Sequence, residues 1–167
     1  MDSEGNLVWQ RSLGTAGSAR GAAVTLAPNG EIVVAGTASS GDEIQGDMLV
    51  ARFNAKGQEL SNTVIRQVGA ETASAVTVGR DGSIFVAGRA SSGGDAVIVK
   101  LDSAGKLIER RTIDSGGSDS VAALAIDGEG AFLPLRTSRA LPRCAASAPR
   151  WARMQAALSW VRPQRAR

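Results

Sequence analysis

The sequence contains no histidine and a single cysteine, and these two shortages remove many of the common catalytic and metal-binding chemistries. Without histidine there is no Ser-His-Asp arrangement, no imidazole general base and no metal site with a histidine ligand. Cys144 has no partner cysteine, so it can form neither an internal disulfide nor a thiolate cluster. Chemistry in this chain would have to come from carboxylates or from a partner.

Long apolar runs are also missing. No stretch of 18 or more apolar residues occurs, and the N-terminal MDSEGN lacks the basic and apolar regions of a signal peptide. We therefore expect no membrane span and no export signal within these residues. An export signal of a longer parent protein would lie outside them, so the compartment stays open.

Charge is divided unevenly along the chain. Residues 1–131 hold 11 Lys and Arg against all 16 Asp and Glu, whereas residues 132–167 hold eight Arg and no acid. The net charge of +3 is therefore the sum of a −5 segment and a +8 segment. Because the positive charge belongs to the tail, it is a weak indication of a nucleic-acid surface, and we expect no nucleic-acid partner.

The chain repeats itself. The stretch GEIVVAGTASS at 30–40 returns as GSIFVAGRASS at 82–92, with eight of eleven positions identical. Glycines at 5, 57 and 105, and at 30, 82 and 130, share spacings of 52 and 48 residues. Further matching runs occupy residues 22–27, 74–79 and 122–127, and residues 47–53 and 95–101. A fixed period of this length indicates a repeat architecture.

The runs have the composition of short β-strands. Residues 32–34 and 97–99 are β-branched blocks that favour strands buried on both faces. Asn29-Gly30 and Asp81-Gly82 stand between such blocks and accept the positive φ angles of a tight hairpin turn. Four antiparallel strands in a unit of 48–52 residues are typical of a propeller blade. We predict an all-β fold of antiparallel four-stranded β-propeller-type blades, in about two and a half repeats.

Three motifs carry a resemblance to a known family. They are the NG or DG hairpin, the VAG that closes the following strand, and the pattern D-x-x-V/I-x-R/K-φ-x-x-x-G in residues 47–57 and 95–105. Together they resemble the bacterial β-propeller repeats called SBBP and the similar delta-60 type, over residues 1 to about 130. The resemblance implies parts of secreted or cell-surface propellers, often multidomain. The second unit departs from the family pattern because it lacks a Trp near position 61.

The pattern breaks in the third unit. After AIDGEGA a strand like IVVAG should follow, but FLPLRTSRALPRC stands there, and Pro134 falls where a central strand needs an N–H donor. We divide the chain into a propeller repeat segment, residues 1–131, and a basic Arg/Ala/Pro-rich tail, residues 132–167. The units are about 5–56, 57–104 and a partial 105–131. We expect a disordered or partly helical tail and hypothesise that it is an out-of-frame or foreign continuation.

Two and a half blades leave strand edges and apolar faces open. In repeat proteins each unit buries its faces only against its neighbours. We therefore expect an isolated chain of marginal stability that associates through open blade edges.

A glycine-rich loop gives one candidate site. Gly14, Gly17 and Gly21 in GTAGSARG suggest a phosphate cradle, but no GK[ST] follows and the segment enters a strand rather than a helix. Residues 115–118, SGGS, occupy the same repeat position in the third unit. We interpret both segments as flexible interstrand loops.

Acidic residues give a second candidate. Asp42, Glu43 and Asp47 could bind Ca²⁺ through carboxylate oxygens, yet their spacing matches no calcium loop, and solvated loop charge is the favoured interpretation. Asp42 and Asp95 could serve as paired carboxylates in glycoside cleavage only if they face each other across a cleft. Asp47 and Asp95 are repeat-equivalent, which indicates a structural aspartate that opens the same strand in each unit.

The tail gives a third candidate. Its apolar side chains recur at spacings of three and four, with arginines between them, so an amphipathic basic helix is one interpretation. The apolar positions are Trp151, Met154, Leu158 and Val161, and the arginines are Arg150, Arg153 and Arg162. Such a helix could bind an anionic membrane, a partner groove or phosphates. Disorder, or a partly helical accidental tail, is the favoured alternative.

These observations favour a binding protein over an enzyme. We assign no catalytic, cofactor-binding or metal-binding residue and no cofactor. The expected function is that of a fragment of a bacterial β-propeller repeat protein, acting as a non-catalytic scaffold whose loops bind protein or carbohydrate. The alternatives are a hydrolase or lyase hosted by the propeller, and a truncated product without independent function. Because propeller folds serve unrelated activities, the fold alone does not identify the ligand.

Overall fold

The computed structural model describes residues 3–13, 17–39, 46–66, 70–90, 94–114 and 118–127, together with the backbone of residues 132–138. This part of the chain forms ten strands and no helix. The strands make three antiparallel sheets, in which strands that follow one another in the sequence are neighbours. The predicted all-β class is confirmed, and so are the four-stranded antiparallel units.

The first two sheets are complete four-stranded meanders. The first sheet contains β1 (Ser18–Leu26), β2 (Ile32–Ser39), β3 (Asp47–Phe53) and β4 (Glu59–Ile65). The second sheet contains β5 (Glu71–Val78), β6 (Ile84–Ala90), β7 (Ala96–Leu101) and β8 (Leu107–Ile113). The third sheet contains β9 (Asp119–Ile126) and β10 (Phe132–Ser138).

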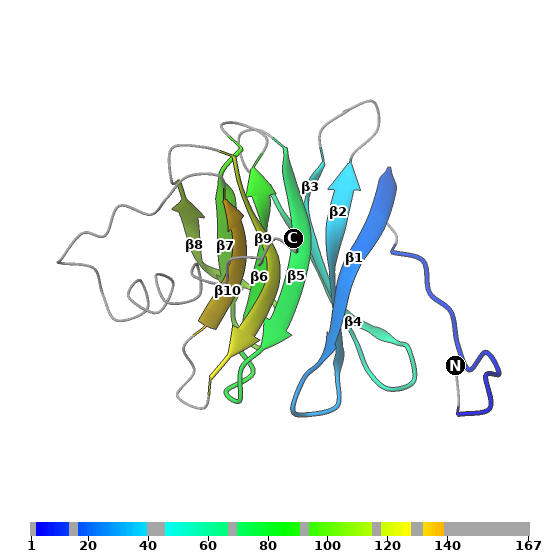
Figure 1. Ribbon diagram of the computed structural model, residues 1–167. Coiled ribbons are helices and arrows are strands. Elements are labelled where there is room, and N and C mark those ends of the chain that lie inside the picture. Colours follow the sequence, from blue (N-terminus) through cyan, green and yellow to red (C-terminus); the bar gives the residue numbers. More distant parts are fainter. Residues whose placement is uncertain are drawn as a thin grey trace, which may run out of the picture.

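The sheets stack face to face, as Figure 1 shows. The first strand of the second sheet, β5, contacts β1, β2 and β3 on one side and β9 on the other. The strands β1, β5 and β9 therefore follow one another across the stack, and the second sheet lies between the other two.

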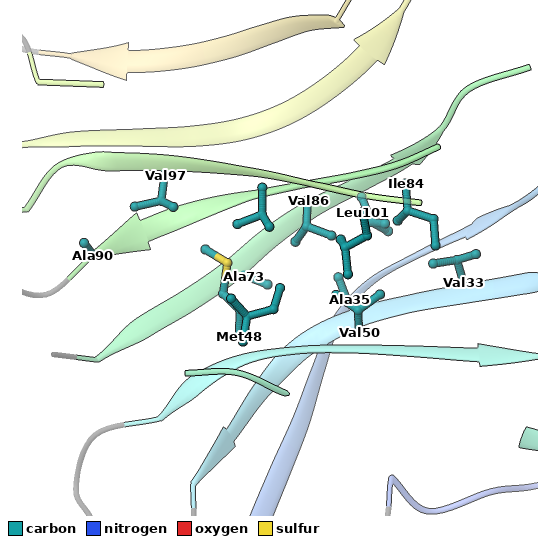
Figure 2. Packing of buried hydrophobic residues seen from close by; sticks show 13 residues of the cluster. Val33, Ala35, Met48, Val50, Ala73, Ile84, Val86, Ala90, Val97 and Leu101 are labelled. Atoms are coloured by element: carbon teal, nitrogen blue, oxygen red, sulfur yellow. The ribbon is translucent and has the colours of Figure 1, made fainter. Parts of the chain in front are cut away.

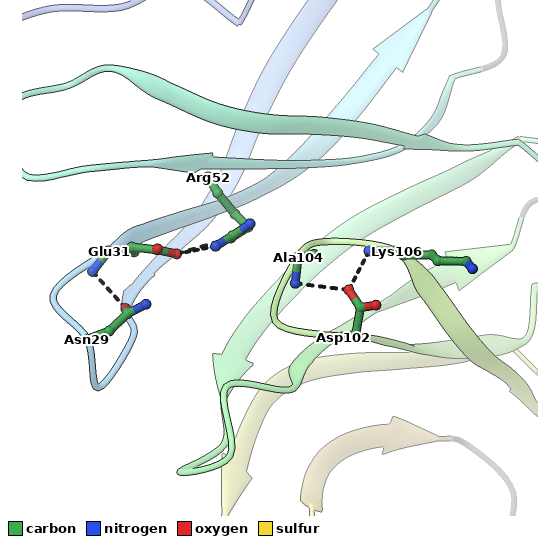
Figure 3. A network of polar contacts seen from close by, with 6 residues as sticks. All are labelled: Asn29, Glu31, Arg52, Asp102, Ala104 and Lys106. Atoms are coloured by element: carbon green, nitrogen blue, oxygen red, sulfur yellow. Dashed lines mark hydrogen bonds and ion pairs between the residues drawn. The ribbon is translucent and has the colours of Figure 1, made fainter.

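The hairpin turns depend on glycine at their last position. Gly30 and Gly82 both have φ of 81°, whereas no described residue other than glycine has a positive φ. The turns are therefore three-residue loops that end in a left-handed glycine, and Asn29 and Asp81 do not share that conformation. The amide of Gly30 donates to the Ala27 carbonyl at 2.9 Å. The Asn29 side chain accepts from the Glu31 amide at 3.1 Å (Figure 3).

The turn between β3 and β4 and the turn between β7 and β8 repeat this design. Asp102 Oδ1 accepts from the amides of Ala104 and Lys106 at 2.9 and 2.8 Å (Figure 3). Asn54 Oδ1 does the same for the amides of residues 56 and 58, 48 positions earlier. Asn and Asp are interchangeable here because each supplies an oxygen acceptor to the turn.

The main core lies between the first and second sheets, where apolar side chains from both meet (Figure 2). The first sheet contributes Val33, Ala35, Met48, Val50 and Ile65, and the second contributes Ala73, Val76, Ile84, Val86, Ala90, Val97, Val99 and Leu101. A smaller cluster of Ala87, Ala96, Ile98 and Val121 joins the second sheet to the third. Strands β6 and β7 are thus apolar on both faces, as predicted for the β-branched run of β7 at residues 97–99; in the run at residues 32–34 of β2, Val33 is buried and its two neighbours are half-buried. Each fully buried Val, Leu or Ile side chain contributes about 1.5–3 kcal/mol.

The turns before β4 and β8 each contact the chain segment that precedes their own sheet. The Gly105 carbonyl accepts from Thr63 Oγ1 of β4 at 2.8 Å. The Gly57 carbonyl accepts from Arg11 Nε at 2.8 Å, and Trp9 lies against Phe53 with ring centroids 6.3 Å apart. Positions 11 and 63 are repeat-equivalent. Residues 6–13, the N-terminal segment, therefore relate to the first sheet as β4 relates to the second.

The third sheet continues beyond the boundary that we expected from the sequence. β10 occupies residues 132–138, which we assigned to the basic tail, and pairs antiparallel with β9 so that Pro134 lies opposite Leu124. In the described part of the chain β10 has β9 as its one neighbour, so proline is tolerated there as on an edge strand. Residues 139–167, including Cys144 and the predicted helix at 151–161, lie outside the described residues.

The contact between Trp9 and the Gly57 turn can be tested with two alanine substitutions. Gly57 and Gly30 both have positive φ, but a Cβ on Gly57 would lie 2.6 Å from the Trp9 ring, whereas one on Gly30 meets nothing within 4 Å. Both substitutions strain the backbone, by about 1 kcal/mol. We expect Gly57→Ala to lower the free energy of unfolding by about 1–3 kcal/mol more than Gly30→Ala, measured by urea denaturation. Equal losses would show that Trp9 does not pack on this turn.

Candidate functional site

A small groove opens between the first and second sheets at the edge that carries the hairpins. Its volume is about 230 Å³. Its walls come from the β1–β2 hairpin, the β5–β6 hairpin and the β7–β8 turn, and they consist of Ala27, Pro28, Asn29, Glu31, Val33, Arg52, Val78, Arg80, Asp81, Gly82, Ile84 and Ser103. Pockets for drug-sized molecules are larger, about 300–1,000 Å³. The groove therefore suits one side chain or one small polar group.

One wall of the groove is a fixed ion pair. Arg52 extends from β3, and Glu31 stands directly before β2 (Figure 3). The guanidinium donates to Glu31 Oε2 from Nη2 at 2.5 Å and from Nε at 3.1 Å. The two side chains are only 13% and 21% exposed. Two hydrogen bonds to one carboxylate oxygen hold both groups in place, so the groove keeps a charged wall of defined geometry.

The opposite wall carries the other two charges. Arg80 is exposed at the end of the groove, and Asp81 follows it in the β5–β6 turn. The Ser83 hydroxyl lowers the pKa of Asp81 most, and the Ser83 backbone amide lowers it further, while slight burial opposes them. The distances from these two donors to Asp81 are 2.8 and 3.0 Å. Asp81 is therefore ionised at neutral pH, and the groove presents two positive and two negative side chains.

The glycine-rich loop does not lead into a helix. β1 begins at Ser18, and Gly21 lies within it, so the segment enters a strand as expected. Gly14 lies outside the described residues, as do Ser115, Gly116 and Gly117 of the third unit. The described part offers no helix N-terminus that could hold a phosphate.

The acidic candidates are not brought together by the described residues. Asp47 is the first residue of β3, and its carboxylate lies 3.9 Å from the Arg66 guanidinium, a side chain that is 76% exposed. Asp95 directly precedes β7. The two aspartates thus stand at equivalent strand starts, as predicted. Asp42 and Glu43 lie outside the described residues, so the calcium interpretation and the Asp42–Asp95 pair stay predictions.

The described residues contain no group of three metal-ligating side chains. Among them there is also no helix of the length and hydrophobicity that a membrane crossing requires.

Sequence reasoning missed a buried ion pair at the opposite edge of the sheets. Glu71, the first residue of β5, is 2% exposed, and its Oε1 accepts from Arg110 Nε at 3.1 Å and also from Nη2. Its second oxygen is buried without a hydrogen-bond partner. Asp119 begins β9 in the same way, fully buried, 48 residues later. The detectable signal was an acid at the same repeat position, the first residue of β5 and of β9.

The fold and a family comparison agree on the class of protein. Residues 27–58 match the family described as a domain of unknown function (DUF5122) beta-propeller. The match spans the β1–β2 hairpin, β2, β3 and the turn that follows, which include the Glu31–Arg52 pair. The chain therefore carries β-propeller repeats, which confirms the resemblance found in the sequence.

One particular relative is a bacterial regulatory protein. The chain is 32% identical over 145 residues to the "Regulatory protein FlaEY" of Caulobacter vibrioides. The alignment covers 77% of this chain and 14% of that protein. The chain thus spans about a seventh of the length of the relative it matches.

Ser83 is expected to control the ionisation of Asp81. Ser83→Ala removes the hydroxyl donor, so the pKa of Asp81 should rise toward its ordinary value of 3.8. In the unsubstituted chain the stabilisation from ionised Asp81 is present above that value and is lost as the pH falls through the lowered pKa. An NMR titration of the Asp81 carboxyl carbon measures the change. Ser103→Ala, in the same groove, is the control and should leave the titration unchanged.

Two neighbouring arginines provide a test of the buried pair. Arg110→Met leaves the buried Glu71 carboxylate without its cation, and we expect the free energy of unfolding to fall by about 3 kcal/mol. Arg111→Met removes an ion pair with Glu109 whose side chains are both 46% exposed, which should cost at most about 1 kcal/mol. Urea denaturation of both variants compares the two losses. Similar losses would contradict a special role for the Glu71–Arg110 pair.

Proposed function

We propose that this chain is a non-catalytic scaffold that binds a protein partner through the groove between its first two sheets. The observation that carries the proposal is the placement of two cations and two carboxylates around a small open cavity. Hydrogen bonds hold Glu31, Arg52 and Asp81 before any ligand arrives. Preorganised charges reduce the ordering cost of binding and select partners by complementary charge.

A protein partner is favoured over a carbohydrate. Charges of both signs in one groove match a peptide segment that carries an acidic and a basic side chain, whereas a neutral sugar needs no ionised partner. The small volume is sufficient for one anchoring side chain. The similarity to a protein named as regulatory supports a role in binding other proteins.

The state of the two carboxylates supports a binding role over a hydrolase or lyase. General acid-base catalysis needs a group whose pKa lies near the working pH. Glu31 is held in an ion pair, and the pKa of Asp81 is lowered rather than raised. Paired carboxylates in glycosidases have pKa values pushed apart so that one keeps its proton, whereas the pKa of Asp81 is lowered overall, despite the slight opposing effect of burial.

The proposal predicts a charge-dependent peptide preference. The full chain is immobilised and used to select from a random peptide library, and the same chain is applied to a glycan array. We expect selected peptides that carry both acidic and basic residues. Their affinity should fall about tenfold or more for Arg80→Glu, a loss of about 1.4 kcal/mol, measured by calorimetry.

Arg20→Glu is the matched control. Arg20 is an exposed arginine of β1 that does not line the groove, so its reversal should change affinity little. Peptides that bind Arg80→Glu and the unsubstituted chain equally would exclude the groove as the binding site. Selective glycan binding without peptide binding would replace the protein partner by a carbohydrate.

A further inference from the structure

The outer face of β1 exposes two large apolar side chains. Val24 is 67% exposed and Leu26 is 70% exposed. Ala23, which precedes them, packs on the core toward the second sheet. Because side chains alternate along a strand, Val24 and Leu26 point away from that sheet. Figure 1 shows β1 at the end of the stack, where no further strand of the described residues covers it.

The repeat indicates what belongs on this face. Val76 and Val78 of β5 are the equivalents of Val24 and Leu26, 52 residues later. Val76 is only 9% exposed and lies in the core between the first and second sheets, and Val78 packs against that core. These positions in β5 are therefore covered by a preceding sheet, and the same positions in β1 are not.

The N-terminal segment strengthens this conclusion. Arg11 contacts the Gly57 turn as Thr63 of β4 contacts the Gly105 turn. The N-terminal segment therefore contacts the first sheet in the way that the outermost strand of a preceding sheet would. The inner strands of such a sheet would lie beside Val24 and Leu26, and no described residue occupies that position.

The other end of the stack presents the complementary surface. Ala123 and Ala125 of β9 are exposed. Ala123 is the equivalent of Ala75, which is 7% exposed and lies opposite Ala87, a member of the cluster that contacts the third sheet. One chain therefore carries both surfaces of a sheet-to-sheet interface. The Val24 and Leu26 face lies at one end of the stack, and the Ala123 and Ala125 face lies at the other.

We propose that the face formed by Val24 and Leu26 binds the β9–β10 sheet of a second copy of this chain, head to tail. The contact continues the interface that already joins the first and second sheets. Two such contacts related by a twofold axis close a ring of two chains. Each chain contributes three sheets, so the ring has six, within the range of four to eight found in propellers.

The mass of the full chain in solution tests the proposal. We expect the unsubstituted chain to have the mass of two copies by sedimentation equilibrium. The double variant Val24→Lys and Leu26→Lys should have the mass of one copy. Ile108→Lys, an equally apolar and 56% exposed position on β8, is the control and should stay dimeric. Circular dichroism checks that all three retain the same β-sheet content, which is expected because the substituted side chains are exposed.

Crosslinking distinguishes the possible occupants of the face. Two variants, Val24→Cys and Ala123→Cys, are made in a Cys144→Ser background and treated with a short bismaleimide. We expect crosslinked dimers when the two variants are mixed and none with either alone. Crosslinking of Val24→Cys with itself would overturn the head-to-tail arrangement. A one-copy mass of the unsubstituted chain in the sedimentation experiment would overturn the proposal. If the thiol of the Val24→Cys variant is then also protected from reaction with maleimide, other residues of the same chain cover the face.

Discussion

Sheet-on-sheet packing of apolar faces is the constraint on which the other features of this structure depend. Each complete sheet is four strands wide, and its central strands carry small and β-branched side chains on both faces. A single sheet of this kind cannot bury its apolar area alone. The second sheet is covered on both sides, and its β6 and β7 contribute apolar residues to both core clusters. The hairpins, the groove and the exposed end follow from this stacking.

The groove lies between the first two sheets, at the edge where their hairpins begin. Of the charges along its rim, Asp81 is held by Ser83 within its own hairpin, and Glu31 is held by Arg52 of the neighbouring strand β3. They are positioned relative to each other by the apolar core behind them, through Val33 and Ile84. Packing of the apolar core thus sets the spacing of the groove walls, and hydrogen bonds set the direction of the Glu31, Arg52 and Asp81 side chains. Loops carried on a rigid scaffold are a common basis of recognition.

Much of the fold could be predicted from local signals. The spacing of Gly30 and Gly82 located the hairpins, and the β-branched runs located β2 and β7, because these features depend on residues close in sequence. Strand β10 was missed because pairing with β9 outweighs the local effect of Pro134 and of the change in composition. The pairs Glu31–Arg52 and Glu71–Arg110 join residues 21 and 39 positions apart, and no local pattern encodes such partners.

The position of the Gly57 and Gly105 turns has a consequence for how the units are connected. The sequence unit that begins at residue 57 contains β4 of the first sheet and β5, β6 and β7 of the second. Each complete sheet is therefore assembled from two successive sequence units, and a sheet cannot leave its neighbour without removing a strand from it. Duplication of one such unit in the gene would add one whole sheet with its outer strand already supplied. Because sequence units and sheets are offset by one strand, recombination can lengthen the array by whole sheets. The strand that neighbouring units share opposes the separation of their sheets when the chain is pulled.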